Sequence, residues 1–346
     1  MAYISFQPSD HFNTVTYTGN GSTQSITGVG FQPDFFWGKA RNIAYSHRFI
    51  DSTRGTSKLL YSDSTGAEDT ASTQVTSFDS DGFSLGSANG LNQDTKTFVA
   101  WNWLANGGTT SSNTDGSITS TVQANTTAGF SIVTYTSASG AQTVGHGLGV
   151  APDMYIIKER SSAGDDWFVY HSSLGAGYKL RLSATSASAS DTSIWNNTEP
   201  TSSVFSLGND QGGVNQYTSG TQNYVAYCFA EIKGFSKFGK YTGNGSTNGT
   251  FVYTGFKPAF VMTKRTNDVG PWNMKDNKRP GYNDTDDSLF ADQSVVEDVR
   301  SFDILSNGFK LRNSGTEMNG GGSTYIYMAF AEHPLVASTG LPATAR

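Results

Sequence analysis

The stretch that decides the fold is Tyr17-Thr-Gly-Asn-Gly-Ser-Thr23, because it returns unchanged as Tyr241-Thr-Gly-Asn-Gly-Ser-Thr247 and in looser form as Tyr135-Thr-Ser-Ala-Ser-Gly-Ala141. Each copy is a turn-forming run that follows an aromatic residue, which is typical of a connection between β-strands. A turn that occurs three times indicates an internal repeat. We therefore expect the architecture of the chain to repeat three times as well.

Two further signatures follow each turn in the same order. A proline introduces an apolar run at Pro33, Pro152 and Pro258. The spacing of roughly one hundred residues is too long for solenoid units, which have about 20–50 residues. An apolar strand then closes each copy: Phe98-Val-Ala-Trp-Asn-Trp-Leu-Ala105, Tyr224-Val-Ala-Tyr-Cys-Phe-Ala-Glu231 and Tyr325-Ile-Tyr-Met-Ala-Phe-Ala-Glu332. Each copy is long enough to bury a core of its own.

The closing strands are apolar on both faces, which is typical of a central strand of a sheet that is covered on both sides. Asp81-Gly82 and Asn307-Gly308 lie between short apolar stretches, a pattern that predicts hairpins with type I′ turns. No segment has more than two turns of helical periodicity, and residues 294–301 are the best helical candidate. The sequence predicts an all-β protein of three tandem antiparallel β-sandwich (jelly-roll-like) domains.

The domain boundaries are predicted from the composition of the segments that connect the repeats. We expect repeat one over residues 1–105, repeat two over 117–233, repeat three over 234–335, and a C-terminal tail over 336–346. Residues 106–116 are polar and glycine-rich, which predicts a flexible linker. The second joint is only Ile232-Lys-Gly-Phe-Ser236, so repeats two and three are expected to pack as a pair, with repeat one hinged.

Composition and charge exclude several classes of protein. The chain has 346 residues, of which 36% are hydrophobic and 15% charged, and its formal net charge is −6. No cluster of basic residues is present, which argues against nucleic-acid binding. No apolar run reaches the roughly 18 residues of a membrane span, so we expect no membrane insertion. The N-terminus lacks the pattern of a signal peptide, so synthesis in a cytoplasm is expected.

The residue types that carry enzymatic chemistry form no recognisable constellation. The five histidines fall at unrelated positions of the repeats, and none lies in a nucleophile motif. Asp284-Thr-Asp-Asp287 is open to two interpretations, a solvated loop, which we favour, or a Ca²⁺ site. Cys228 occupies a small-residue position of a closing strand, which favours a structural thiol. We expect no catalytic residue, no cofactor and no metal.

Cationic residues recur after each proline: Lys39 and Arg41, Lys158 and Arg160, and Lys264 and Arg265. One interpretation is a solvent-facing strand end whose long side chains cover apolar surface. The other is an interface, or a contact with an acidic glycan, that is made three times. We favour the first interpretation and keep the second.

The chain resembles a repeat family of marine bacteriophage virion proteins that are described as structural or tail-fibre-like. The resemblance rests on the turn at Tyr241, on Val144-Gly-His-Gly-Leu-Gly-Val-Ala-Pro-Asp153, on the closing strands at Tyr224 and Tyr325, and on the opening Ile4-Ser-Phe-Gln-Pro-Ser-Asp-His-Phe-Asn13. It covers essentially the whole chain. It implies a non-enzymatic virion structural protein on the particle exterior, either a tail fibre or appendage or a head-decoration protein, that aids host attachment.

The expected partners follow from the same resemblance. We expect other copies of the chain, with a trimer as first choice by analogy, other virion proteins, and a host surface glycan or receptor. An alternative is a lectin-like carbohydrate-binding module, for which Trp195 is the best candidate because it lies outside the repeated motifs. A less favoured alternative is a glycan depolymerase, which requires two carboxylates about 5–10 Å apart.

Overall fold

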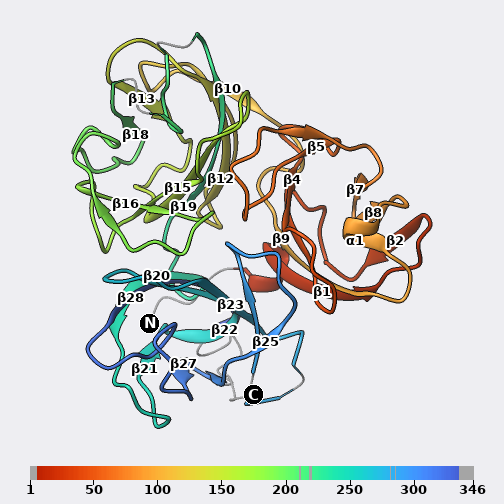
Figure 1. The fold of residues 1–346 in the computed structure, drawn as a ribbon. Coiled ribbons are helices and arrows are strands. Elements are labelled where there is room, and N and C mark those ends of the chain that lie inside the picture. Colours follow the sequence, from red (N-terminus) through yellow and green to blue (C-terminus); the bar gives the residue numbers. More distant parts are fainter. Residues whose placement is uncertain (1–5, 210–211, 218–219, 281, 285, 335–346) are drawn as a thin grey trace.

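The computed structural model describes residues 6–209, 212–217, 220–280, 282–284 and 286–334. Its ribbon forms three lobes around a common centre, one for each repeat (Figure 1). The regular structure is almost entirely β-strand, which confirms the all-β prediction. The helices within the described ranges are short, η1 (Pro8–Asp10) and α1 (Asn89–Asn92). The best helical candidate, residues 294–301, is not a helix and contains the strand β25 (Asp298–Val299).

Repeat one contains a four-stranded sheet in the order β1-β9-β3-β4, a three-stranded sheet in the order β2-β8-β7 and the pair β5-β6. The bounds are β1 (Phe12–Thr18), β2 (Gln24–Thr27), β3 (Phe35–Ala40), β4 (Arg48–Asp51), β5 (Lys58–Leu59), β6 (Asp69–Thr70), β7 (Val75–Asp79), β8 (Gly82–Leu85) and β9 (Thr97–Trp103).

Repeat two contains an eight-stranded sheet in the order β10-β11-β12-β19-β14-β15-β16-β17 and the pair β13-β18. The bounds are β10 (Ser111–Asn113), β11 (Ser120–Asn125), β12 (Phe130–Thr136), β13 (Gln142–Gly145), β14 (Met154–Glu159), β15 (Phe168–His171), β16 (Tyr178–Arg181), β17 (Ala189–Ser190), β18 (Val204–Leu207) and β19 (Asn223–Phe229).

Repeat three contains a six-stranded sheet in the order β20-β28-β22-β23-β24-β25 and a three-stranded sheet in the order β21-β27-β26. The bounds are β20 (Ser236–Thr242), β21 (Phe251–Tyr253), β22 (Phe256–Arg265), β23 (Trp272–Asp276), β24 (Asp287–Phe290), β26 (Phe302–Leu305), β27 (Gly308–Leu311) and β28 (Thr324–Pro334).

The three large sheets share one strand order. In each, the closing strand lies between the strand that leads into the repeated turn (β1, β12 or β20) and the strand at the proline (β3, β14 or β22), and all pairs are antiparallel. The registers agree as well: Trp103 pairs with Phe35, Phe229 with Met154, and Phe330 with Phe260. The closing strand is therefore central in each sheet, as its two apolar faces predict.

Each closing strand contributes to two different cores. One face of each large sheet packs against the small sheet of its own repeat, which gives three separate clusters of buried side chains. The opposite faces of all three sheets meet in a single shared cluster, which contains Trp103, Phe229 and Phe330. The ring centroid of Trp103 lies 6.2 Å from that of Phe229 and 5.6 Å from that of Phe330. This shared core joins the three lobes, and the prediction that repeat one is hinged is wrong.

The segment predicted to be a flexible linker is held in place. The carboxylate of Asp34 accepts hydrogen bonds from the backbone N–H groups of Ala105, Gly107 and Gly108, each at 2.8 Å. The side-chain oxygen of Gln123 also accepts from the Gly108 N–H. Further along, β10 pairs with β11. The prediction of a flexible linker over residues 106–116 is therefore wrong.

The two predicted hairpins are present as β7–β8 and β26–β27. The turn type differs from the prediction. A type I′ turn needs positive φ at both central residues, whereas the register of the first hairpin makes Ser80 and Asp81 the central residues, and neither has a positive φ.

Candidate functional site

The three recurring lysines lie at equivalent places and are fully buried. Lys39, Lys158 and Lys264 each follow the proline of their repeat by the same interval, on β3, β14 and β22. None has measurable exposure to solvent. The favoured interpretation of these residues as solvent-facing strand ends is therefore wrong for the lysines.

Each lysine reaches across to a neighbouring repeat. The ammonium of Lys39 donates to the carbonyl of Ser294 at 3.2 Å, that of Lys158 to Thr65 at 3.4 Å, and that of Lys264 to Thr185 at 2.9 Å. Each also donates to a carbonyl of its own repeat: Ala40, Asp165 and Gly270. Repeat one thus contacts repeat three, repeat two contacts repeat one, and repeat three contacts repeat two. We call the contact region between two neighbouring repeats a seam. The three lobes form a closed ring with three seams, and a buried lysine makes the same contact in each.

Burial changes the acid–base properties of these lysines. Removal of the ammonium from water lowers the pKa of Lys39 to about 7 and that of Lys264 to about 8. It also lowers the pKa of Lys158, although the carboxylates of Asp165 and Glu159 act in the opposite direction. The backbone carbonyls of each seam accept hydrogen bonds from the ammonium group in place of water.

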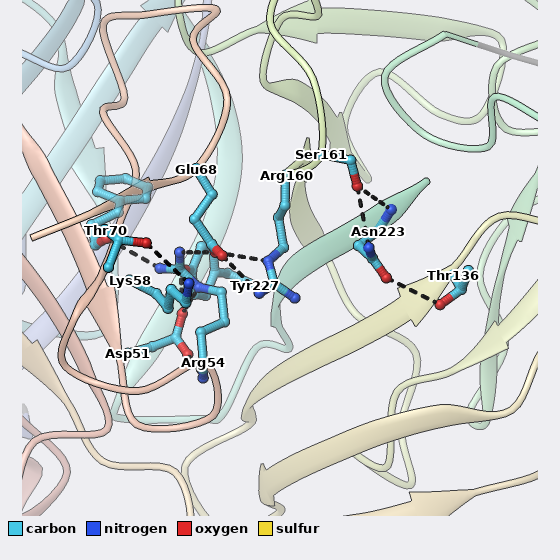
Figure 2. Close-up of polar contacts among 11 residues, drawn as sticks. Asp51, Arg54, Lys58, Glu68, Thr70, Thr136, Arg160, Ser161, Asn223 and Tyr227 are labelled. Atoms are coloured by element: carbon cyan, nitrogen blue, oxygen red, sulfur yellow. Dashed lines mark hydrogen bonds and ion pairs between the residues drawn. The ribbon is translucent and has the colours of Figure 1, made fainter. Parts of the chain in front are cut away.

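The seam between repeats one and two contains a network of charged side chains (Figure 2). Arg160 forms two hydrogen bonds to Glu68, at 2.7 and 2.9 Å. Glu68 also accepts from Arg54 at 2.9 Å. Arg54 pairs with Asp51 at 2.5 Å, and the hydroxyl of Tyr227 donates to Asp51 at 2.7 Å. Three residues of repeat one and two of repeat two thus share one network.

The network is largely buried, and this affects its ionisation. The side chains of Asp51 and Arg54 are fully buried, and Glu68 is 10% exposed. Burial opposes ionisation of Glu68, but the hydrogen bonds and charges of Arg160 and Arg54 outweigh it and lower the pKa of that carboxyl. Likewise, burial opposes the charge of Arg54, but Asp51, Tyr227 and Glu68 together outweigh this effect and raise its pKa. The charged forms of both partners are favoured in the folded state.

The seam between repeats three and one carries the same arrangement. Arg41 pairs with Glu297 at 2.7 Å, and Glu297 also accepts from Arg279 at 3.1 Å. Arg279 pairs with Asp276 at 2.6 Å, and the indole N–H of Trp101 donates to Asp276 at 3.0 Å. The two networks correspond residue by residue, with Trp101 in the place of Tyr227.

The seam between repeats two and three has uncharged side chains at the positions that form these networks in the other two seams. Thr266 stands where the other seams have Arg41 or Arg160, and its carbonyl accepts from the Ser188 N–H at 2.9 Å. The imidazole of His171 replaces the Asp51-type carboxylate and contacts the carbonyl of Tyr327 at 3.2 Å. Repeats two and three were expected to pack as a pair with repeat one hinged, whereas charged networks join repeat one to both of its neighbours.

A family model described as a domain of unknown function (DUF7483) matches residues 7–334. The chain belongs to this DUF7483 family. The match spans all three repeats and every seam residue described above. A search of curated proteins finds no match.

The remaining predicted site residues of the DUF7483 chain lie apart from the seam networks. Arg265 pairs with Asp268 of its own loop at 3.2 Å, where Asp268 is 59% exposed. Trp195 is fully buried and donates its indole N–H to the carbonyl of Tyr178. A lectin-like site that uses an exposed Trp195 is therefore contradicted.

Sequence reasoning missed the acidic and arginine partners within the seams. A signal for them exists, because Asp51-Ser-Thr-Arg54 and Asp276-Asn-Lys-Arg279 occupy equivalent places in repeats one and three. The two glutamates also recur, since Glu68 and Glu297 are each followed by an aspartate. Repeat two lacks both patterns, which hides the signal from a search for features common to all three copies.

Glu159 and Asp165 form a close pair of carboxyl groups in the described part of this DUF7483 chain. Burial and a hydrogen bond with Asp165 raise the pKa of Glu159 to about 7. Two carboxyl groups that share a hydrogen bond are closer than the roughly 5 Å or more that separates the pair in a glycosidase. This geometry does not match the spacing expected of a depolymerase.

The other candidate positions make structural contacts. Asp284 accepts from the N–H of Phe302 at 2.7 Å, and no group of three His, Cys, Asp or Glu suited to a metal occurs among the described residues. The imidazole of His146 contacts the carbonyl of Thr201 and accepts from the N–H of Leu148. Cys228 is buried, and burial raises the pKa of its thiol. Within the same ranges, no helix has the length and apolar character to span a membrane.

Proposed function

We propose that this chain is a non-enzymatic structural protein of a bacteriophage virion. It is displayed on the particle exterior as a tail appendage or head-decoration protein and aids host attachment. The observation that supports this proposal most is the closed ring of three seams. The polar residues that recur through the chain hold its own repeats together, as is expected of a rigid building block.

The seams suit a protein that must keep its shape outside a cell. A shared apolar core gives most of the stabilisation, because burial of apolar surface contributes about 25 cal/mol per Å². The buried networks around Glu68 and Glu297 add directional contacts that fix how neighbouring lobes sit. The motifs that resemble marine phage virion proteins are the second support.

The chain is proposed to act together with other virion proteins and with further copies of itself, because symmetric assembly is common among soluble oligomers and several weak contacts presented together bind far more tightly than one. A trimer stays the first choice by analogy. One chain already arranges three similar lobes around a centre (Figure 1). The alternative to a trimer is therefore a single chain at each threefold position of the particle.

The experiment that tests the proposal uses virions of the phage that encodes this chain. We expect the chain to co-migrate with infectious particles through a density gradient and to occupy density on the tail or on the head surface in a particle reconstruction. The copy number from the reconstruction decides between a trimer and a single chain at each position. Absence of the chain from gradient-purified particles would contradict the proposal.

A further inference from the structure

The small sheet of repeat three has an outward face that differs from its two counterparts. Register places Phe251 of β21 opposite Lys310 of β27, which lies opposite Asp303 of β26. Tyr253 lies opposite Gly308 in the next row. Side chains alternate along a strand, so these residues share one face, with Arg312 beside Asp303. We call Phe251, Tyr253, Asp303, Lys310 and Arg312 the aromatic face.

The opposite side of the same sheet accounts for its stability. Val252, Phe309 and Ile304 alternate with the residues of the aromatic face and are buried in the core of repeat three. In contrast, the side chains of Tyr253 and Phe251 are 56% and 44% exposed. Both rings keep a large part of their surface in water, and a pair of exposed aromatic residues on one face indicates a contact surface.

Repeats one and two provide an internal comparison. The positions of Phe251 and Tyr253 are held by Ser25 and Thr27 in repeat one, where the hydroxyls of Ser25 and Ser84 bond to each other at 2.8 Å. In repeat two they are held by Thr143 and Gly145. There the edge is covered by the segment that contains Ser117, whose N–H donates to the hydroxyl of Thr143, and Ile118, which bridges to Val144. Among these three described sheets, only the small sheet of repeat three has exposed aromatic rings on an edge strand that no other segment covers.

We propose that the aromatic face binds an anionic saccharide chain. Residues two apart on a strand are about 7 Å apart, so a linear ligand that lies along β21 meets both rings. The electron-rich faces of Phe and Tyr attract the C–H edges of a sugar ring and shield its apolar side from water. The phenol hydroxyl and the polar side chains beside the rings are suited to hydrogen-bond sugar hydroxyls and so to fix the orientation of the ligand.

The charge of the face favours an acidic saccharide over a neutral one. Lys310 donates to the side-chain oxygen of Asn248 at 2.7 Å, and it shares the single carboxylate of Asp303 with Arg312. Arg312 contacts Asp303 at 3.4 Å, and its side chain remains 43% exposed. The face thus has two cations and one carboxylate on a chain whose net charge is −6. Cations of this kind form their strongest hydrogen bonds with carboxylates.

The size of the face favours a saccharide over a folded protein. A stable protein interface buries about 800 Å² on each partner around an apolar centre. The aromatic face has two rings, and the neighbouring turn over residues 243–250 consists of glycine, asparagine, serine and threonine. Such a small, polar surface fits a few units of a sugar chain.

The test uses the purified full-length chain in native gels that contain polygalacturonate, a linear polymer of carboxylated sugars, or the neutral polymer dextran. We expect polygalacturonate to retard the chain and dextran to have little effect. The variant F251S/Y253T, which introduces the residue types of Ser25 and Thr27, should bind polygalacturonate about tenfold more weakly or worse. K310S, which introduces the residue type of Ser84, should also weaken binding and should reduce its dependence on salt.

A matched control shows whether a loss of binding is specific to the aromatic face or follows from any loss of exposed apolar residues. V295S/V296A alters two other exposed apolar residues of repeat three, each 42% exposed, and should bind as the unaltered chain does. Thermal unfolding of every variant checks that the fold is retained. The proposal is overturned if polygalacturonate does not retard the chain, if dextran retards it equally, or if F251S/Y253T binds unchanged. Self-association that F251S/Y253T abolishes, without saccharide binding, would make the face a protein interface and would also overturn it. The proposal rests on the purified chain, so its outcome is independent of whether the chain belongs to a virion.

Discussion

Arg160 of repeat two holds Glu68 of repeat one with two hydrogen bonds, at 2.7 and 2.9 Å, although the two residues are far apart in the chain. The same carboxylate accepts from the buried Arg54. Glu68 therefore contacts one arginine from each of the two repeats. Its removal should affect the seam more than loss of any single exposed ion pair.

The first prediction concerns the substitution Glu68→Gln. It removes the charge that both Arg54 and Arg160 contact, and Arg54 is fully buried. We expect a loss of about 2 kcal/mol in the free energy of unfolding, because a buried charge loses one of its partners. Urea denaturation measures this. Asp268→Asn is the matched control: it breaks the exposed Arg265 pair, which should contribute less than about 1 kcal/mol. Equal effects of the two substitutions would contradict the role of the seam.

The second prediction is the pH dependence that Glu68 contributes. Its pKa is lower in the folded state than the ordinary value of 4.5. Above pH 4.5 the carboxylate is ionised in both states, and its full stabilising contribution is present. As the pH falls through the folded-state pKa, protonation removes that contribution. The difference in unfolding free energy between the unaltered chain and Glu68→Gln should therefore shrink below pH 4.5. A constant difference between pH 3 and pH 7 would contradict this.

The closing strands show what a sequence can predict. Trp103, Phe229 and Phe330 occupy the same position of the repeated motif. Because the closing strands are apolar on both faces, each was predicted to be the central strand of a sheet, and each is. Such a pattern is local, since it depends on the two-residue period of a strand and on residue type. The repeated order of turn, proline and closing strand likewise predicted the shared strand order of the three sheets.

The contacts between repeats could not be predicted from the sequence. The recurrence of Lys39, Lys158 and Lys264 was visible, but their burial was not, because the carbonyls that replace water belong to other repeats. The segment from Asn106 to Gly108 resembles a flexible linker in composition, yet the N–H groups of its two glycines donate to Asp34, which lies some 70 residues earlier. Contacts of this kind depend on how the lobes pack, and one copy of a repeat does not encode that packing alone.

The third prediction replaces Trp103 by alanine. Its ring contacts Phe12 and Phe35 of its own repeat and also Phe229 and Phe330 of the other two. We expect a loss of about 3–5 kcal/mol, as for other large-to-small changes in a core. The shared core predicts that calorimetry shows one transition that shifts as a whole. Tyr178→Ala, at a ring that is 44% exposed, should have a much smaller effect. Loss of one transition with others unchanged would instead support a hinged repeat one.

The last prediction is that the buried lysines make the fold more stable as the pH rises above neutrality. Burial lowers the folded-state pKa of Lys39 to about 7, whereas its ordinary value is 10.5. Between these two pH values the unfolded chain holds a proton that the folded chain has released, so stability increases with pH. Lys39→Met removes this titration and keeps a side chain of similar length. Urea denaturation at intervals from pH 6.5 to pH 10 should show a steeper rise in unfolding free energy for the unaltered chain than for Lys39→Met. The other buried lysines titrate equally in both proteins and cancel in the comparison. Parallel curves would mean that Lys39 stays protonated in the seam, with Asp63 and Glu297 offsetting the effect of burial.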